Sequence, residues 1–65
     1  ISVLVEKESK KSSSQWSGRT EGGTWVVFDK NNEKIGELVD IKIDDARGVT
    51  LFGSRVHREY KYEVA

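Results

Sequence analysis

Apolar and polar residues alternate along most of this chain, and the alternation predicts short β-strands. Residues 1–5 place most of their apolar side chains on one face of an extended segment, as the period of two of a half-buried strand requires. Residues 38–43 show the same period most clearly, with Val39, Ile41 and Ile43 on one face and Asp40 and Lys42 on the other. Both segments are predicted to be half-buried strands.

Three further strands follow from residue type and from turn signals. Residues 16–21 and 24–28 flank Gly22-Gly23, a dipeptide expected to form a type I′ turn with positive φ at both glycines. Residues 24–28 are rich in β-branched and aromatic residues, which favour strands. A turn over 44–48 leads to a fifth strand at 49–52, with Val49 and Leu51 expected to face inward. Gly53 is expected to mark a bulge or a bend.

No segment has a sustained 3.6-residue period, so the chain is predicted to be all-β. Five short strands in so few residues favour a small, curved, five-stranded antiparallel barrel, because closing the sheet removes exposed edges. We expect the barrel to occupy residues 1–56. Residues 57–65 mix polar and apolar side chains and are expected to extend the last strand or to form a tail.

Length and composition narrow the possible classes of protein. The chain has 65 residues and no Cys, so one small core must hold the fold without disulfides or thiolate metal ligands. No apolar run is long enough to span a bilayer. The chain has no Met, and we therefore expect Ile1 to be an internal position of a longer protein or the product of processing.

The charge is balanced overall but unevenly distributed. The chain has eleven basic and eleven acidic residues, so its formal net charge is zero. A neutral chain is not expected to bind a polyanion strongly by itself. Residues 1–20 and 46–65 each carry two excess positive charges, whereas residues 21–45 carry four excess negative charges. If the first and last strands lie side by side, the two basic segments form one basic face.

Candidate chemistry is almost absent. His57 is the only His, and Ser12, Ser13 and Ser14 have no nearby base that could activate a nucleophile. The acidic turn near Asp44 lacks the spacing of a calcium-binding loop. We therefore expect no catalytic residue, no metal site and no cofactor within this chain.

A binding surface is the better prediction. Residues 9–15 are small and polar and are expected to form an exposed loop. Small barrels bind RNA by pairing cations that contact phosphates with aromatic rings on which bases stack. Trp16 is expected to be partly exposed and Trp25 to point into the core with Val27.

Several segments, in their order and spacing, resemble the TRAM domain that ends the tRNA methylthiotransferases of the MiaB type. The most specific segment is Gly18-Arg19-Thr20-Glu21. The other matching segments are Val3-Leu4-Val5-Glu6, Ser9-Lys10-Lys11-Ser12, Val26-Val27-Phe28, the stretch 36–43, Ala46 and Thr50-Leu51-Phe52-Gly53. The resemblance covers residues 3–56.

The resemblance implies an OB-like, RNA-binding barrel within a longer cytoplasmic enzyme. In such enzymes an upstream radical-SAM domain uses S-adenosylmethionine and [4Fe–4S] clusters held by Cys. It adds a methylthio group to a prenylated adenosine beside the tRNA anticodon. The resemblance therefore implies two partners, the anticodon arm of tRNA and the upstream domain of the same chain, and no membrane.

Eight residues are expected to contact RNA. Lys10, Lys11, Arg19 and Thr20 match the basic loop and the Gly-Arg-Thr-Glu segment of the family. Charge and expected exposure add Lys7, Trp16, Arg47 and Arg55.

Two alternatives remain open. In a related branch of the family the substrate is a ribosomal-protein side chain, and the same domain then contacts protein. The barrel could also be a structural module that docks on its parent enzyme and touches no nucleic acid. Steep salt dependence of tRNA binding would separate phosphate contacts from apolar docking.

Overall fold

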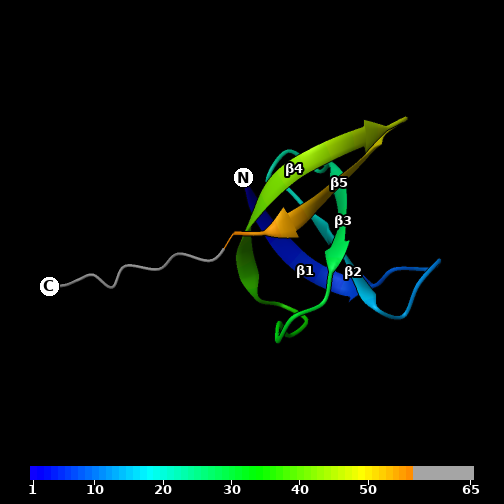
Figure 1. The fold of residues 1–65 in the computed structure, drawn as a ribbon. Helices are drawn as coiled ribbons and strands as arrows, with labels where there is room; N and C mark the ends of the chain where they lie inside the picture. Colours follow the sequence, from blue (N-terminus) through cyan, green and yellow to red (C-terminus); the bar gives the residue numbers. More distant parts are fainter. Residues whose placement is uncertain (57–65) are drawn as a thin grey trace, which may run out of the picture.

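The structure, a computed structural model, describes residues 1–56 as five strands that close into a barrel (Figure 1). The strands are β1 (Ser2–Glu8), β2 (Gln15–Arg19), β3 (Trp25–Asp29), β4 (Leu38–Arg47) and β5 (Thr50–Arg55). The order around the ring is β1-β2-β3-β5-β4. The predicted all-β, five-stranded barrel is confirmed. The predictions for His57 and for the rest of 57–65 lie outside the described residues.

One pairing in the ring is parallel, so the expectation of a wholly antiparallel barrel was wrong. β3 and β5 run in the same direction, with Val26 opposite Leu51 and Val27 opposite Phe52. The other four pairings are antiparallel. Parallel neighbours need a long crossover, and here β4 and its flanking loops supply it.

The first and last strands are not neighbours, because β2 and β3 lie between them on one side and β4 on the other. The expected basic face made by the two ends of the chain is therefore not formed by strand adjacency. Instead, Lys7, Lys10 and Lys11, from the end of β1 and the loop after it, lie over the outer face of β2, β3 and β5.

The core is small and made of alternate residues from β1, β3 and β4. Six apolar side chains are buried in it: Val3, Val5, Val26, Phe28, Val39 and Ile41. Trp16, Ile43 and Leu51 pack against this cluster. The predicted inward faces of β1 and β4 are confirmed.

β4 is longer than predicted, and this displaces the following turn. Residues 44–47, expected to be a turn, continue the strand and pair with β5 as far as Arg47 opposite Thr50. The turn is reduced to Gly48 and Val49, and Val49 is 84% exposed. The expectation that Val49 faces inward was wrong because it sits at the tip of the hairpin.

The β2–β3 turn also differs from the prediction. The Gly23 N–H donates to the Thr20 carbonyl at 2.9 Å, and of the two glycines only Gly23 has positive φ, at 91°. A turn followed by one left-handed glycine is the second common way to close a hairpin. The turn is located correctly, but the type I′ assignment is wrong.

Two glycines allow close contact between strands. A Cβ on Gly18 would lie 2.5 Å from the Leu4 carbonyl oxygen, and one on Gly53 would collide with the Lys42 carbonyl oxygen. The register of β4 against β5 shifts between Ile43 and Asp45, next to Gly53. The irregularity predicted at Gly53 is therefore present, on the opposite strand.

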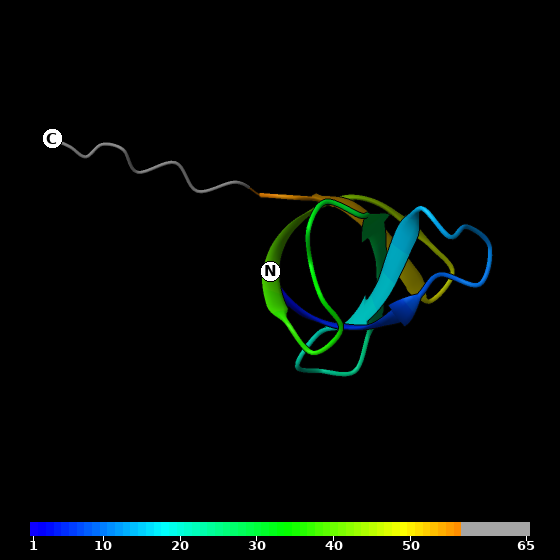
Figure 2. The same ribbon diagram turned by 90° about the horizontal axis from the view of Figure 1, so that it is seen from below.

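The segment between β3 and β4 crosses the opening of the barrel when the ring is viewed from below (Figure 2). It is fixed to β1 by two backbone hydrogen bonds, from Val5 N–H to the Glu37 carbonyl at 2.9 Å and from Gly36 N–H to the Val5 carbonyl at 2.8 Å.

Within residues 1–56 the structure contains no helix long and apolar enough to cross a membrane.

Candidate nucleic-acid interface

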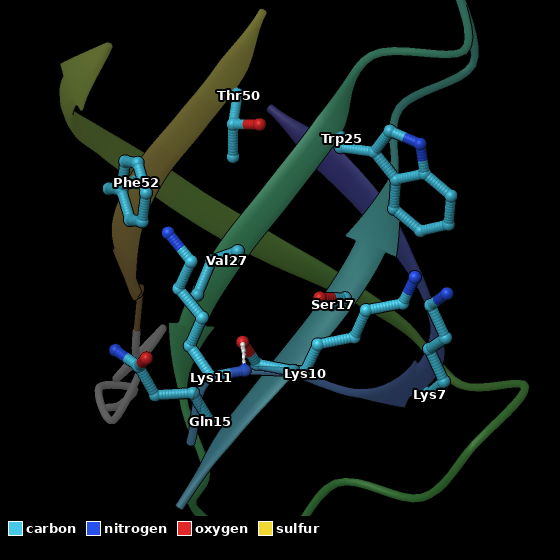
Figure 3. A pocket seen from close by; sticks show the side chains of 10 residues that line it. Lys7, Lys10, Lys11, Gln15, Ser17, Trp25, Val27, Thr50 and Phe52 are labelled. Atoms are coloured by element: carbon cyan, nitrogen blue, oxygen red, sulfur yellow. Dashed lines mark hydrogen bonds between the residues drawn. The ribbon is translucent and has the colours of Figure 1, made fainter. Parts of the chain in front are cut away.

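A groove of about 460 Å³ lies on the outer face of β2, β3 and β5, beneath the loop that follows β1. Because alternate strand residues point to opposite faces, the neighbours of the core residues line this groove. Figure 3 shows Val27 between Trp25 on one side and Phe52 on the other. The ten lining residues are Lys7, Ser9, Lys10, Lys11, Gln15, Ser17, Trp25, Val27, Thr50 and Phe52.

Three lysines surround one end of this groove. Lys10 and Lys11 belong to the 9–14 loop, which is closed at its base by the Ser9 N–H donating to the Gln15 carbonyl at 2.9 Å. Lys7 comes from the end of β1, where the register shifts after Val5. None of the three ammonium groups forms an ion pair with a carboxylate of residues 1–56, and no acidic residue lines the groove. The groove is locally cationic although the chain is neutral.

Trp25 lies on the outer surface, so the expectation that it points into the core was wrong. In β3 the buried residues are Val26 and Phe28, whereas Trp25 and Val27 are partly exposed. The Lys7 ammonium lies 5.1 Å from the centroid of the indole ring, and the Arg19 guanidinium carbon lies 4.6 Å from it. Cations over indole faces are favourable contacts.

Arg19 is fixed in place by Glu6. Its Nε and Nη2 donate to the two carboxylate oxygens of Glu6 at 3.1 and 3.2 Å. Paired strand positions place Arg19 directly opposite Trp25. The guanidinium charge is thus partly neutralised, and its clearest structural effect is to hold the indole of Trp25.

Arg47 lies near the second aromatic ring of the groove. Its guanidinium carbon is 5.4 Å from the centroid of Phe52, and its Nε donates to Asp45 Oδ2 at 3.0 Å. The Arg47 guanidinium and the Ala46 N–H together hold the pKa of Asp45 below its ordinary value. Arg47 is highly exposed and remains accessible at the edge of the groove.

Trp16 and Arg55 belong to a different cluster, around the buried carboxylate of Glu33. Trp16 Nε1 donates to Glu33 Oε1 at 3.2 Å, and Arg55 Nη1 donates to Oε2 at 2.7 Å. The Asn31 N–H donates to Oε1 at 2.7 Å. Trp16 is partly buried, as expected, with the Lys30 ammonium 4.4 Å from its ring centroid.

The protonation of Glu33 is set by two opposing effects. Burial raises the pKa of its carboxyl group, but the hydrogen bonds from the Asn31 N–H and from Arg55 lower it, and the net pKa lies below the ordinary value of 4.5. Glu33 is therefore ionised at neutral pH and anchors the 30–37 segment to β2 and β5.

Thr20 has a local role in the turn after β2. Its hydroxyl accepts a hydrogen bond from the Thr24 N–H at 3.1 Å. With Arg19 it lines a second hollow, whose lining also includes Leu4, Leu38 and two residues of the β2–β3 turn, Glu21 and Gly23.

Of the eight residues expected to contact RNA, the structure gathers five near the groove. Lys7, Lys10 and Lys11 line it, while Arg19 and Arg47 lie over its aromatic rings. Thr20 lies beside Arg19 in the second hollow, and Trp16 and Arg55 lie in the Glu33 cluster. Sequence reasoning did not predict the other seven lining residues, which are Ser9, Gln15, Ser17, Trp25, Val27, Thr50 and Phe52. The outward alternation of β3 and β5 was the signal that could have identified Phe52.

Residues 1–56 contain no group of three or more His, Asp or Glu side chains placed to hold a metal ion. With no Cys in the sequence, the chain also offers no thiolate to an iron–sulfur cluster. The groove therefore provides a binding surface of cations, aromatic rings and neutral polar groups.

Comparison with known protein families identifies this barrel. The TRAM domain family matches residues 1–56, which is every residue that the structure describes. The chain is a TRAM domain. The family match agrees with the resemblance seen in the Gly18-Arg19-Thr20-Glu21 segment.

Curated relatives of this TRAM domain carry the name tRNA-2-methylthio-N(6)-dimethylallyladenosine synthase. The protein from Christiangramia forsetii is 50% identical over 56 residues, which is 86% of this chain and 12% of that protein. Those from Chloroherpeton thalassium and Porphyromonas gingivalis are 48% identical over 52 residues and 44% identical over 54 residues, covering 80% and 83% of this chain. The chain thus spans about 12% of the length of these relatives.

Proposed function

We propose that this TRAM domain binds tRNA and positions it for a methylthiotransferase active site located elsewhere in a longer protein. The observation that carries the proposal is the groove on β2, β3 and β5, where Lys7, Lys10 and Lys11 surround one end without any acidic neighbour in the lining. Ammonium groups that lack carboxylate partners are free to displace counterions from phosphates. We take tRNA as the nucleic acid because the relatives are named as enzymes that act on tRNA.

The chemistry would belong to other parts of that protein. This chain has no Cys to hold an iron–sulfur cluster, and the groove contains no acid–base pair for catalysis. In the proposal, [4Fe–4S] clusters and S-adenosylmethionine are held by the upstream domain in the cytoplasm, and the substrate is a prenylated adenosine beside the anticodon. The TRAM domain contributes affinity and orientation.

The groove lysines are tested by measuring the salt dependence of binding to an anticodon stem-loop. Each phosphate contact adds about 0.7 to 0.9 to the slope of log affinity against log salt. The double variant Lys10→Ala/Lys11→Ala is expected to lower this slope by about 1.4 to 1.8, because two phosphate contacts are lost.

The matched control is Lys34→Ala/Lys42→Ala, which removes the same charge from two exposed lysines that do not line the groove. It should change the slope by less than half as much. Equal effects of the two double variants would contradict a localised phosphate site. NMR shifts confined to β4 on titration with the stem-loop would also contradict it.

A docking barrel that touches no nucleic acid is the competing function. It is favoured by the exposed apolar side chains of Leu4 and Leu38, which are paired positions on β1 and β4. Such a barrel would show no measurable affinity for the stem-loop at low salt, in the isolated chain or in the longer protein.

A further inference from the structure

We infer that the groove between Trp25 and Phe52 is a site for an unpaired nucleotide of RNA, whose base stacks on the indole of Trp25. This inference rests on the proposed RNA-binding function and specifies which form of RNA the groove accepts. Within it, the lysines contact the phosphates and the aromatic rings contact the base.

The placement of the two rings supports a base rather than a backbone ligand. Trp25 and Phe52 are on neighbouring strands but two residues apart in register, since Trp25 pairs with Thr50 and Val27 with Phe52. Val27 therefore lies between them as an apolar floor, as Figure 3 shows. Both rings are partly exposed on the outer face of the barrel. A phosphate would gain nothing from these three side chains, whereas a base would bury its faces against them.

Hydrogen-bonding groups occupy the remaining positions around the floor. Gln15, Ser17 and Thr50 line the groove with neutral polar groups, which suit the edge of a base. Gln15 Nε2 already donates to Asp29 Oδ1 at 3.1 Å, so the amide oxygen of Gln15 is the group that would accept from a base. The groove volume of about 460 Å³ falls within the range of about 300–1,000 Å³ that encloses small organic ligands.

Arg19 acts as a positioning residue for the indole. Its guanidinium lies 4.6 Å from the Trp25 ring centroid and is held by two hydrogen bonds to Glu6. An indole held by a fixed guanidinium loses less conformational freedom when a base stacks on it, which favours binding. The Lys7 ammonium, 5.1 Å from the same ring, has no carboxylate partner among residues 1–56 and can move to a phosphate.

A paired base cannot use this site. In an RNA duplex both faces of each base are covered by stacking, and recognition of bases by aromatic side chains is confined to loops, bulges and single strands. The groove is therefore expected to discriminate between single-stranded and double-stranded RNA, which the lysines alone would not do.

The test measures how tightly the 65-residue chain binds three RNA probes over the same series of salt concentrations. They are a short single-stranded RNA, the same strand annealed to its complement, and the same strand with abasic residues, which keeps the phosphates and removes the bases. We expect the intact single strand to bind about 5- to 140-fold more tightly than the abasic strand, the range that one stacked base contributes. The duplex should resemble the abasic strand.

Trp25→Ala should remove this advantage of the intact strand over the abasic strand and leave the salt slope unchanged. Trp25→Phe, which keeps a smaller ring, should restore part of it. The indole N–H signal of Trp25 should shift on addition of the intact strand only. Trp16 is the internal control, because it packs on the core and its Nε1 donates a hydrogen bond to Glu33. The indole N–H signal of Trp16 should not shift.

The outcomes separate this inference from the proposed function. If all three probes bind equally, with steep salt dependence and no effect of Trp25→Ala, the site for an unpaired base is refuted while RNA binding stands. If none of the probes binds at low salt, the proposed function itself fails.

Discussion

Among residues 1–56, Glu33 is the one carboxylate whose side chain is fully enclosed, with an exposed fraction of 0%. It accepts hydrogen bonds from Trp16, from Arg55 and from the Asn31 N–H. These donors come from β2, from β5 and from the loop that crosses the barrel opening, so a single side chain fastens three segments. A run of Asp, Asn and Glu between strands looks like an ordinary turn in the sequence, and nothing in its pattern reveals this role.

Glu33→Gln is expected to lower the free energy of unfolding by about 1–3 kcal/mol, because it leaves the Arg55 guanidinium, which is 27% exposed, without its carboxylate partner. Urea unfolding at neutral pH measures it. Glu21→Gln is the matched control, because Glu21 is exposed in the β2–β3 turn, and it should leave the midpoint within experimental error. Equal effects of the two variants would mean that the Glu33 cluster does not hold the loop.

The same carboxylate predicts a pH dependence. The pKa of Glu33 is lower in the folded state than its ordinary value of 4.5, so its ionised form stabilises the fold. That stabilisation is complete above pH 4.5 and is lost as the pH falls through the lowered folded-state pKa. The stability difference between the parent chain and Glu33→Gln should therefore shrink on acidification below pH 4.5. A difference that stays constant would contradict the assignment.

At the level of the strands, the contact between β4 and β5 depends on Gly53 having no side chain. A Cβ there would meet the Lys42 carbonyl oxygen and, at 2.7 Å, the Cγ2 of Ile41. Gly53→Ala is expected to cost about 1–3 kcal/mol through overpacking, measured by thermal or urea unfolding. Gly22→Ala is the control, because its Cβ would lie 3.9 Å from the Thr20 hydroxyl, and it should cost no more than about 0.5 kcal/mol.

β4 supplies the largest aliphatic side chain of the core. Ile41 is fully buried, so Ile41→Ala is expected to cost about 2–5 kcal/mol by creating a cavity. A domain of this length has a total stability of only about 3–10 kcal/mol, and the variant should melt far below the parent or fail to fold. Ile35→Ala tests the specificity of this loss, since Ile35 is exposed and its removal should barely move the melting temperature.

For the whole molecule, the alternation of side chains was enough to predict the fold class and most strands. The strand at residues 38–43 was predictable because one of its faces is apolar and the other is charged. The parallel pairing of β3 with β5 could not be predicted from the sequence pattern, because the relative direction of two neighbouring strands depends on which segments meet after folding. The orientation of Trp25 was misjudged for a related reason: Val26, Val27 and Phe28 are all apolar, so either alternate set could have been the core.

The candidate site was predicted in part. Lys10 and Lys11 were identifiable because a polar loop with two adjacent cations has no core to join. Trp16 and Arg55, which lie in the Glu33 cluster and not at the groove, were chosen from charge and expected exposure alone. Their partner Glu33 is 17 and 22 residues away from them in the sequence, so the cluster exists only in three dimensions.

In the longer protein that we propose, the Lys10→Ala/Lys11→Ala variant should raise the KM for tRNA and leave kcat nearly unchanged. The reason is that the domain would contribute binding in the ground state and the transition state alike. Steady-state kinetics of the intact enzyme measures this. A large fall in kcat at saturating tRNA would mean that the domain also aligns the reacting adenosine.

The ring order places β5 between β3 and β4, although β5 is the last of the five strands to be synthesised. A nascent chain that ends before Thr50 would hold two open sheet edges, of the kind that invite pairing with other chains. Closure must therefore wait until the residues of β5 have left the ribosome. Premature termination before Thr50 would therefore yield an aggregation-prone remnant rather than a slightly shorter barrel.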